Sequence, residues 1–180
     1  SVTDNVGSIT GSLTSGGRTD DTNLTVRVSL TGTNAVAGDT VQLYNTSTAL
    51  GTAYTLLAAD ITAGFADVAT GTLTNGGTTY AINAKVIDIA GNASAASSPD
   101  FTITVDTTAP SAPSITSVTD NVGSITGSLT SGGRTDDTNL TVRVSLTGTN
   151  AVAGDTVQLY NTSTALGTAY TLLAADRKSH

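Results

Sequence analysis

Residues 24–30 have the sequence LTVRVSL, in which apolar and polar side chains alternate without a break. In an extended strand, the apolar side chains of this stretch lie on one face and the polar side chains on the other. The alternation therefore predicts a β-strand with one buried face. Further strands are predicted at residues 80–86 (YAINAKV), 101–105 (FTITV) and 41–44 (VQLY), with weaker candidates around residues 52–57 and 65–73.

The composition supports the same fold class. All fourteen acidic residues are aspartates, and the chain contains no Glu, Cys, Met or Trp. It is rich in Thr, Val and Ile, which favour strands, and in Gly, Asn, Asp and Ser, which favour turns. Short strands at this spacing predict an all-β fold, an Ig-like antiparallel β-sandwich with about seven strands, in tandem repeat.

An internal repeat sets the predicted domain organisation. Residues 117–176 repeat residues 1–60 letter for letter, and the offset has the length of one small β-domain. We expect a complete sandwich repeat at 1–106, a Pro-rich linker at 107–116 and a truncated second copy at 117–176. Residues 177–180 (RKSH) break the repeat and are expected to be a cloning remnant.

The stretch LTNGGTTY, residues 73–80, has two interpretations. A Leu, a glycine turn and a Tyr that begins a long strand resemble the tyrosine corner of Ig-like sandwiches, in which the hydroxyl bonds to backbone upstream. The alternative is a hairpin turn followed by a core Tyr.

Charge and residue types exclude several functions. A net charge of −7 argues against nucleic acid and anionic membrane surfaces as partners, and no apolar run approaches a membrane span of roughly 20 residues. The only histidine falls in the predicted cloning remnant, and no G-x-S-x-G motif is present, so we expect no enzymatic activity. The lack of Cys is typical of a reducing compartment, and it suits equally well a secreted protein that does not rely on disulfides.

Aspartate and asparagine residues cluster at the ends of the predicted strands. Each cluster alone is explained by the preference of these residues for turns. Adjacent carboxylates such as Asp20 and Asp21 repel each other, however, and Ca²⁺ removes that repulsion because it binds 6–8 oxygen ligands. The candidate Ca²⁺ ligands are Asp4, Asn5, Asp20, Asp21, Asp88, Asn92, Asp106, Asp120, Asn121, Asp136 and Asp137.

The expected topology groups these residues at two ends of the sandwich. Residues 4–5 and the loop 88–94 are expected at one end, and residues 20–21 and Asp106 at the other. In an array, the second end of one repeat faces the first end of the next. Residues 20–21 and Asp106 are therefore expected to face residues 120–121 across the linker and to share Ca²⁺, while two prolines stiffen the linker.

The motifs of the chain also resemble a known family. The stretches DNVGSITGSLTSGGRTDDTNLTV (4–26) and VIDIAGNASAASSPDFTITVDTTAPSAP (86–113) are similar to the bacterial Ig-like repeats of giant RTX-type, type I-secreted adhesins and biofilm-associated proteins. The resemblance implies a β-sandwich extender module that is repeated many times, projects an adhesive tip from the cell surface and is stiffened by Ca²⁺ near domain junctions. It also implies an extracellular location at the bacterial cell surface, and neighbouring identical repeats of the same chain as partners.

A second functional class competes with the extender. The loops of the sandwich would in that case bind a glycan or a host protein directly. Letter-perfect duplication favours the extender, because a recognition surface need not be copied unchanged along a stalk, and the few aromatic residues leave little for a glycan platform. The Thr-x-Thr pieces are too short for an ice-binding array. The truncated copy is expected to expose its apolar face and to self-associate between chains.

Overall fold

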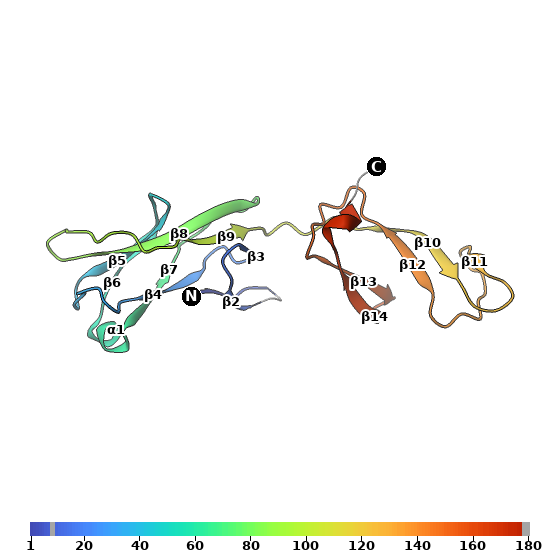
Figure 1. Ribbon diagram of the computed structural model, residues 1–180, viewed down its shortest axis with the longest axis horizontal. Coiled ribbons are helices and arrows are strands. Elements are labelled where there is room, and N and C mark those ends of the chain that lie inside the picture. Colours follow the sequence, from blue (N-terminus) through green and yellow to red (C-terminus); the bar gives the residue numbers. More distant parts are fainter. Residues whose placement is uncertain (8–9, 178–180) are drawn as a thin grey trace. The chain divides into compact units, whose positions relative to one another are not determined.

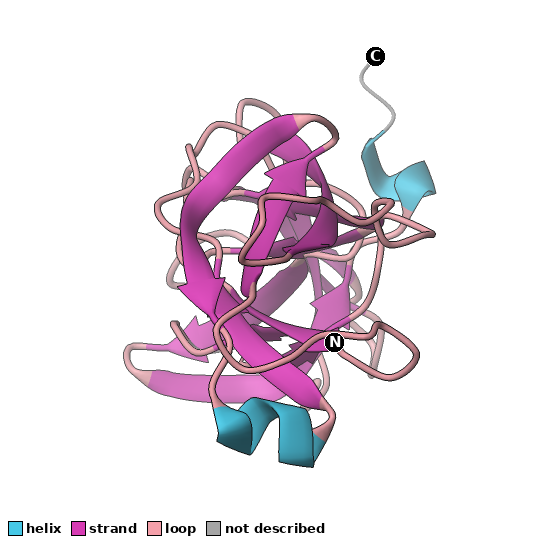
Figure 2. Cartoon of the chain, turned by 90° about the vertical axis from the view of Figure 1, so that its left-hand side faces the viewer, coloured by secondary structure: helices cyan, strands magenta, loops and turns pink. Residues whose placement is uncertain are grey.

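The protein is described from a computed structural model, which covers residues 1–7 and 10–177. The chain divides into two compact units, Ser1–Thr108 and Ala109–His180, each described by itself below (Figure 1). Figure 2 shows that strands make up most of the secondary structure, with helix confined to short segments. The predicted all-β class is confirmed.

Two sheets build the first unit. One has the order β2-β1-β4-β7 and only antiparallel pairs. The other has the order β3-β9-β8-β5-β6, in which β3 and β9 are parallel and the remaining pairs antiparallel. The strands are β1 (Val2–Asp4), β2 (Gly11–Leu13), β3 (Gly17–Thr19), β4 (Thr25–Ser29), β5 (Thr40–Asn45), β6 (Thr48–Thr55), β7 (Phe65–Ala69), β8 (Thr78–Ile87) and β9 (Phe101–Val105).

A single hydrophobic core lies between these sheets. Its buried side chains come from both sheets, so the unit is a β-sandwich. Leu24, Val26 and Leu30 are buried in this core, as the alternation of residues 24–30 predicts, and Arg27 on the opposite face is exposed. The other buried members are Val2, Val41, Leu43, Leu56, Ala66, Val68, Leu73, Tyr80, Ile82, Ala84, Ile103 and Val105.

The tyrosine corner is confirmed. The backbone N–H of Thr74 donates a hydrogen bond of 2.8 Å to the hydroxyl of Tyr80, and the Thr74 hydroxyl lies 2.8 Å from the same atom. The Tyr80 side chain is buried, so the hydroxyl needs this partner. The turn before β8 is thereby fixed to the core.

Several elements differ from the predicted ones. The weak strand candidate at 52–57 is β6, which lies at Thr48–Thr55 and is followed by the helix α1 (Ala58–Ala63). The helix ends at Gly64, which has a φ of 77°, a left-handed conformation that glycine adopts without strain. The candidate at 65–73 is shorter, because β7 ends at Ala69.

The second unit contains two smaller sheets. The strands β10 (Ser114–Asp120), β11 (Gly127–Ser128) and β12 (Thr141–Ser145) form an antiparallel sheet of order β11-β10-β12. The hairpin of β13 (Thr156–Asn161) and β14 (Thr164–Thr171) is followed by the 3₁₀ helix η1 (Ala174–Arg177). β10 begins at Ser114, inside the stretch predicted as linker. No helix in the described ranges is long and apolar enough to cross a membrane.

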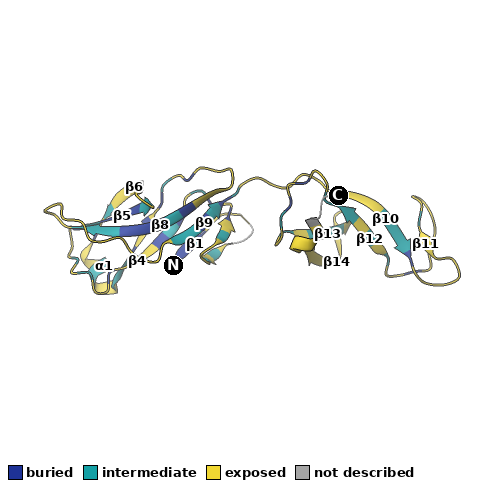
Figure 3. Ribbon diagram, turned by 45° about the horizontal axis from the view of Figure 1, so that its top comes forward, coloured by how far each residue is buried: buried dark blue, intermediate teal, exposed yellow. Residues whose placement is uncertain are grey.

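Identical sequences are buried to different degrees in the two units (Figure 3). Leu43 is fully buried in the first unit, whereas its counterpart Leu159 is only half-buried. All residues of β14 are exposed. The local strand pairing is nevertheless the same, since the β5–β6 and β13–β14 hairpins share one register.

Candidate functional site

Asp4 ends β1 with its carboxylate inside the protein. It is only 3% exposed. Its Oδ1 accepts a hydrogen bond of 2.9 Å from the backbone N–H of Val6, and its Oδ2 accepts one of 2.6 Å from the hydroxyl of Thr19. These bonds offset the free energy cost of burying a charge, and they fasten the end of β1 to the end of β3.

Asp21 is a second buried carboxylate, 2% exposed, beside the first. Its Oδ1 accepts a 2.7 Å bond from the N–H of Asn23, and its Oδ2 accepts a 3.2 Å bond from the N–H of Asn5. The backbone N–H of Asp21 donates to the Thr19 hydroxyl at 3.1 Å. The Thr19 hydroxyl therefore bridges the two aspartates, by donating to Asp4 and accepting from Asp21.

Asp20, the exposed sequence neighbour of Asp21, is the third carboxylate of this segment. Its carboxylate lies directly against Gly7, so closely that a Cβ atom at that position would overlap Oδ2. Gly7 also has a φ of 75°, which favours glycine. We call Asp4, Asn5, Asp20 and Asp21 the acidic cluster of the first unit.

Asp106 lies at this end of the sandwich as well. Its backbone N–H donates a 2.9 Å bond to the carbonyl oxygen of Thr19, because β3 and β9 run in parallel. Its Oδ2 forms an ion pair of 2.8 Å with Nη1 of Arg18, and its Oδ1 accepts a 3.1 Å bond from the N–H of Thr108. The carboxylate of Asp106 is thus already compensated by a cation.

The predicted grouping of the candidate ligands was wrong in one respect. Residues 4–5 were expected at the end that holds the loop 88–94, but they lie at the opposite end with residues 20–21. Asp4 is the last residue of β1, whereas it was expected before the first strand. Its neighbour Thr3 pairs with Thr25, the first residue of the antiparallel strand β4. The end of β1 therefore meets the segment that leads into β4. The grouping of residues 20–21 with Asp106 is confirmed.

Asp88 and Asn92 form a separate, exposed loop after β8. Oδ1 of Asp88 accepts a 2.7 Å bond from the Asn92 N–H, and Oδ2 accepts a 2.9 Å bond from Nδ2 of Asn92. The side-chain bond from Asn92, followed by the backbone bonds, holds the pKa of Asp88 below its ordinary value of 3.8. Since β8 runs antiparallel to β9, this loop lies at the end opposite Asp106.

The second unit repeats the acidic cluster. Asp120 and Asp137 are 3% and 6% exposed, and the Thr135 hydroxyl donates a 2.6 Å bond to Asp120 Oδ2. The N–H of Asn121 donates to Asp137 Oδ2 at 3.2 Å, and Asp136 lies against a glycine as Asp20 does. We call these four Asp and Asn residues the acidic cluster of the second unit. Because it forms without counterparts of β7, β8 and β9, the cluster is a local property of the sequence.

Sequence reasoning missed the threonine that bridges each cluster. Thr19 and Thr135 directly precede the paired aspartates in the motif TDDT, and an oxygen donor at that position was the available signal. The chemistry of the cluster suits a hard cation, because every ligand atom is an oxygen and each hydrogen-bonded carboxylate oxygen keeps a second lone pair. Within residues 1–7 and 10–177, no three acidic, His or Cys side chains form a preassembled metal site.

Comparison with protein-family models, with curated proteins and with solved structures finds no match to this chain.

Proposed function

We propose that the chain is a structural extender module of a large bacterial cell-surface adhesin, for surface attachment or biofilm formation, and that Ca²⁺ stiffens it at the acidic clusters. The observation that carries the proposal is the repetition of one acidic cluster, with its buried aspartates and the same hydrogen bonds, in residues 1–60 and in their exact copy, residues 117–176. An extender needs identical, self-contained sites that stiffen it along its length, and the two clusters repeat the same local contacts.

Charge supports a cation at these positions. Asp4 and Asp21 are almost completely buried, and Asp20, which is exposed and next to Asp21 in the sequence, adds a further negative charge. Their hydrogen bonds come from neutral N–H and O–H groups, which do not cancel the repulsion among the carboxylates. Bound Ca²⁺ supplies the compensating positive charge. Asp4, Asp20 and Asp21 offer carboxylate oxygens, and Asn5 offers an amide oxygen.

The exit of the chain from the first unit also suits a stalk. Asp106 is held by Arg18, and the next residue, Thr107, donates a 2.9 Å hydrogen bond to Oδ1 of Asn75. The direction in which the chain leaves β9 is therefore fixed by side chains of the sandwich. Pro110 and Pro113 follow, and each restricts φ of its own residue.

The distribution of aromatic side chains favours an extender over a glycan-binding module. Tyr80 is buried, and the other Tyr and Phe side chains of the first unit are partly buried. Tyr44 lies under the ammonium group of Lys85, 5.3 Å from the ring centre, and Phe65 lies under the guanidinium of Arg27 at 3.9 Å. Because cationic side chains of the protein cover these two rings, the rings do not offer a surface for stacking with a sugar.

Thermal unfolding with and without Ca²⁺ tests the proposal. We expect saturating Ca²⁺ to raise the melting temperature of the chelator-treated chain, because Ca²⁺ at 100 times Kd adds about 2.7 kcal/mol per site to the free energy of unfolding. The double variant Asp20→Asn with Asp136→Asn should lose this response. Asp67→Asn breaks the exposed ion pair with Arg27, which shares no residue with either cluster, and this variant should keep the response to Ca²⁺. A melting temperature that is unchanged by Ca²⁺ contradicts the proposal.

A further inference from the structure

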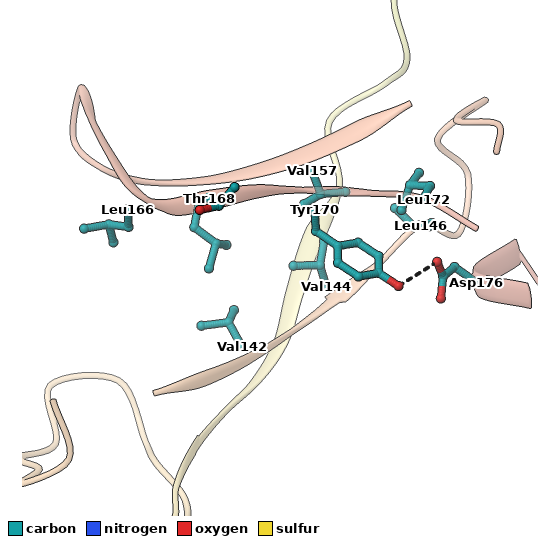
Figure 4. Close-up of a pocket in the computed structure, with 10 residues that line it drawn as sticks. Val142, Val144, Leu146, Val157, Leu166, Thr168, Tyr170, Leu172 and Asp176 are labelled. Atoms are coloured by element: carbon teal, nitrogen blue, oxygen red, sulfur yellow. Dashed lines mark hydrogen bonds between the residues drawn. The ribbon is translucent and has the colours of Figure 1, made fainter. Parts of the chain in front are cut away.

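The second unit has a cavity where the first unit has a core. The cavity has a volume of about 350 Å³, and apolar side chains of both sheets point into it (Figure 4). Its lining includes Val142, Val144, Leu146, Leu159, Leu166 and Tyr170. In the first unit, the residues with the same neighbours in sequence belong to the core or pack against it. We call this surface of the second unit the open face.

The first unit shows what covers this face. There, β7 supplies Ala66 and Val68, β8 supplies Tyr80, Ile82 and Ala84, and β9 supplies Ile103 and Val105 to the core. All of these residues fall in the stretch 61–106, which directly follows residues 1–60 in the chain. The second unit contains a copy of residues 1–60 only. The open face therefore corresponds to the surface that residues 61–106 cover in the first unit.

The strand edges beside the open face are also available. In the first unit, the whole of β4 pairs with β7, and the whole of β5 pairs with residues 82–87 of β8. In the described part of the second unit, β12 pairs with β10 and β13 pairs with β14, so that one edge of each is unpaired. Exposed edges offer backbone N–H and C=O groups to another strand. A partner that supplies two strands satisfies both edges.

A glycine of β14 leaves room beside the open face for a close contact with the backbone of another segment. In the first unit, a Cβ on Gly51 would lie 2.8 Å from the carbonyl oxygen of Thr70, and a Cβ on Gly71 would lie 2.8 Å from Cα of Gly51. Gly167 is the counterpart of Gly51, and no atom lies within 4 Å of its Cβ position. The space that the backbone of residues 70–71 fills in the first unit is thus free in the second.

Charge adds a further point of complementarity. In the first unit, Arg27 donates hydrogen bonds of 2.8 and 2.7 Å to both carboxylate oxygens of Asp67 and covers the ring of Phe65. Arg143 occupies the same position on β12. A segment with the sequence of β7 therefore brings to Arg143 an acidic and an aromatic partner.

We propose that the open face of the second unit binds a polypeptide with the sequence of residues 61–106, which completes a second sandwich in the arrangement that these residues have in the first unit. The chain's own residues 61–106 stay on the first unit, because they continue directly from Asp60 through α1. The partner in this proposal is a second polypeptide that carries this half of the repeat. The proposal is independent of Ca²⁺ and of the extender function.

The test adds an isotope-labelled peptide of residues 61–106 to the unlabelled full chain. We expect one peptide to bind per chain, as measured by the mass of the complex in solution. We also expect the amide signals of its Thr78–Ile87 segment to move to the positions that β8 has in the labelled chain. A chain that self-associates through the open face should become monomeric when the peptide is added. Self-association that the peptide does not reverse overturns the proposal, as does a peptide that remains unfolded.

Variants in the second unit separate binding at the open face from exchange into the first unit. Leu159→Asp places a carboxylate where its counterpart, Leu43, is fully buried, and should weaken binding at least about 100-fold. Ser163→Asp, on the exposed turn of the β13–β14 hairpin, should leave the affinity unchanged. The peptide variant Gly71→Val should fail to bind, because its side chain meets Cα of the glycine on β14. Undiminished binding to the Leu159→Asp chain overturns the proposal.

Discussion

Replacing one leucine by alanine in each copy of the repeat measures how much the core depends on residues 61–106. Leu43 and Leu159 occupy the same position of the repeat, opposite Leu50 and Leu166 in their hairpins. Leu43 is 0% exposed in the core, whereas Leu159 lines the cavity of the second unit. The two substitutions remove the same atoms from different surroundings.

The expected magnitudes differ for that reason. Leu→Ala in a packed core costs about 2–5 kcal/mol, because it removes buried apolar surface and leaves a cavity. We therefore expect Leu43→Ala to lower the free energy of unfolding of the first unit by about 3 kcal/mol. Leu159 has mainly its cross-strand contact to lose, and such pairs contribute about 0.2–1 kcal/mol. Leu159→Ala should cost less than about 1 kcal/mol, and only in the second unit.

Amide hydrogen exchange of β8 is the assay, because residues 78–87 occur once in the chain and report on the first unit alone. For a loss of 2–5 kcal/mol, Leu43→Ala should accelerate the exchange of these amides about 30-fold to 4,000-fold. Leu159→Ala should leave it unchanged. Equal acceleration by both variants, or a change below about threefold for Leu43→Ala, would show that the core of the first unit does not depend on Leu43 as described.

Three further predictions concern the polar groups. Thr19→Val removes the hydroxyl that bridges two buried partners, so it should lower the free energy of unfolding of the first unit by about 2 kcal/mol or more. Urea unfolding, with the amide exchange of β8 as the probe, measures this loss. Thr135→Val should leave the exchange of β8 unchanged. Asn92→Ala should raise the pKa of Asp88 toward 3.8, which carboxyl-carbon NMR measures. In the parent chain, the hydrogen bonds from Asn92 stabilise the loop above pH 3.8, and this stabilisation is lost as the pH falls through the lowered pKa. Asp106→Ala should change the free energy of unfolding by less than about 1 kcal/mol, because its ion pair is solvent-exposed; a larger loss in the same urea experiment would contradict this.

The longer strands of the first unit could be predicted from the sequence because their side chains alternate. The stretch 24–30 carries its own pattern of burial, and β8 and β9 lie close to their predicted ranges. β1, β2 and β3 have three residues each, too few for a period to be recognised, and their pairing is set by the strands beside them.

The candidate site was predictable in its residues but not in its grouping. Paired aspartates indicate an acidic cluster, yet the position of Asp4 depends on whether it opens or closes a strand, and a strand of three residues leaves that undecided. The degree to which a side chain of the second copy is buried does not follow from residues 117–176 alone either. Leu43 and Leu159 have identical local sequences, and only the presence of β7, β8 and β9 distinguishes their surroundings.

Calorimetric titration of Ca²⁺ into the chelator-treated chain measures directly whether Ca²⁺ binds at the acidic clusters. We expect saturable binding that is lost when Asp4, Asp21, Asp120 and Asp137 are all replaced by Asn, and kept when Asp88 is replaced by Asn. Absence of binding heat in the parent chain, or the same binding in the fourfold variant, would contradict the account.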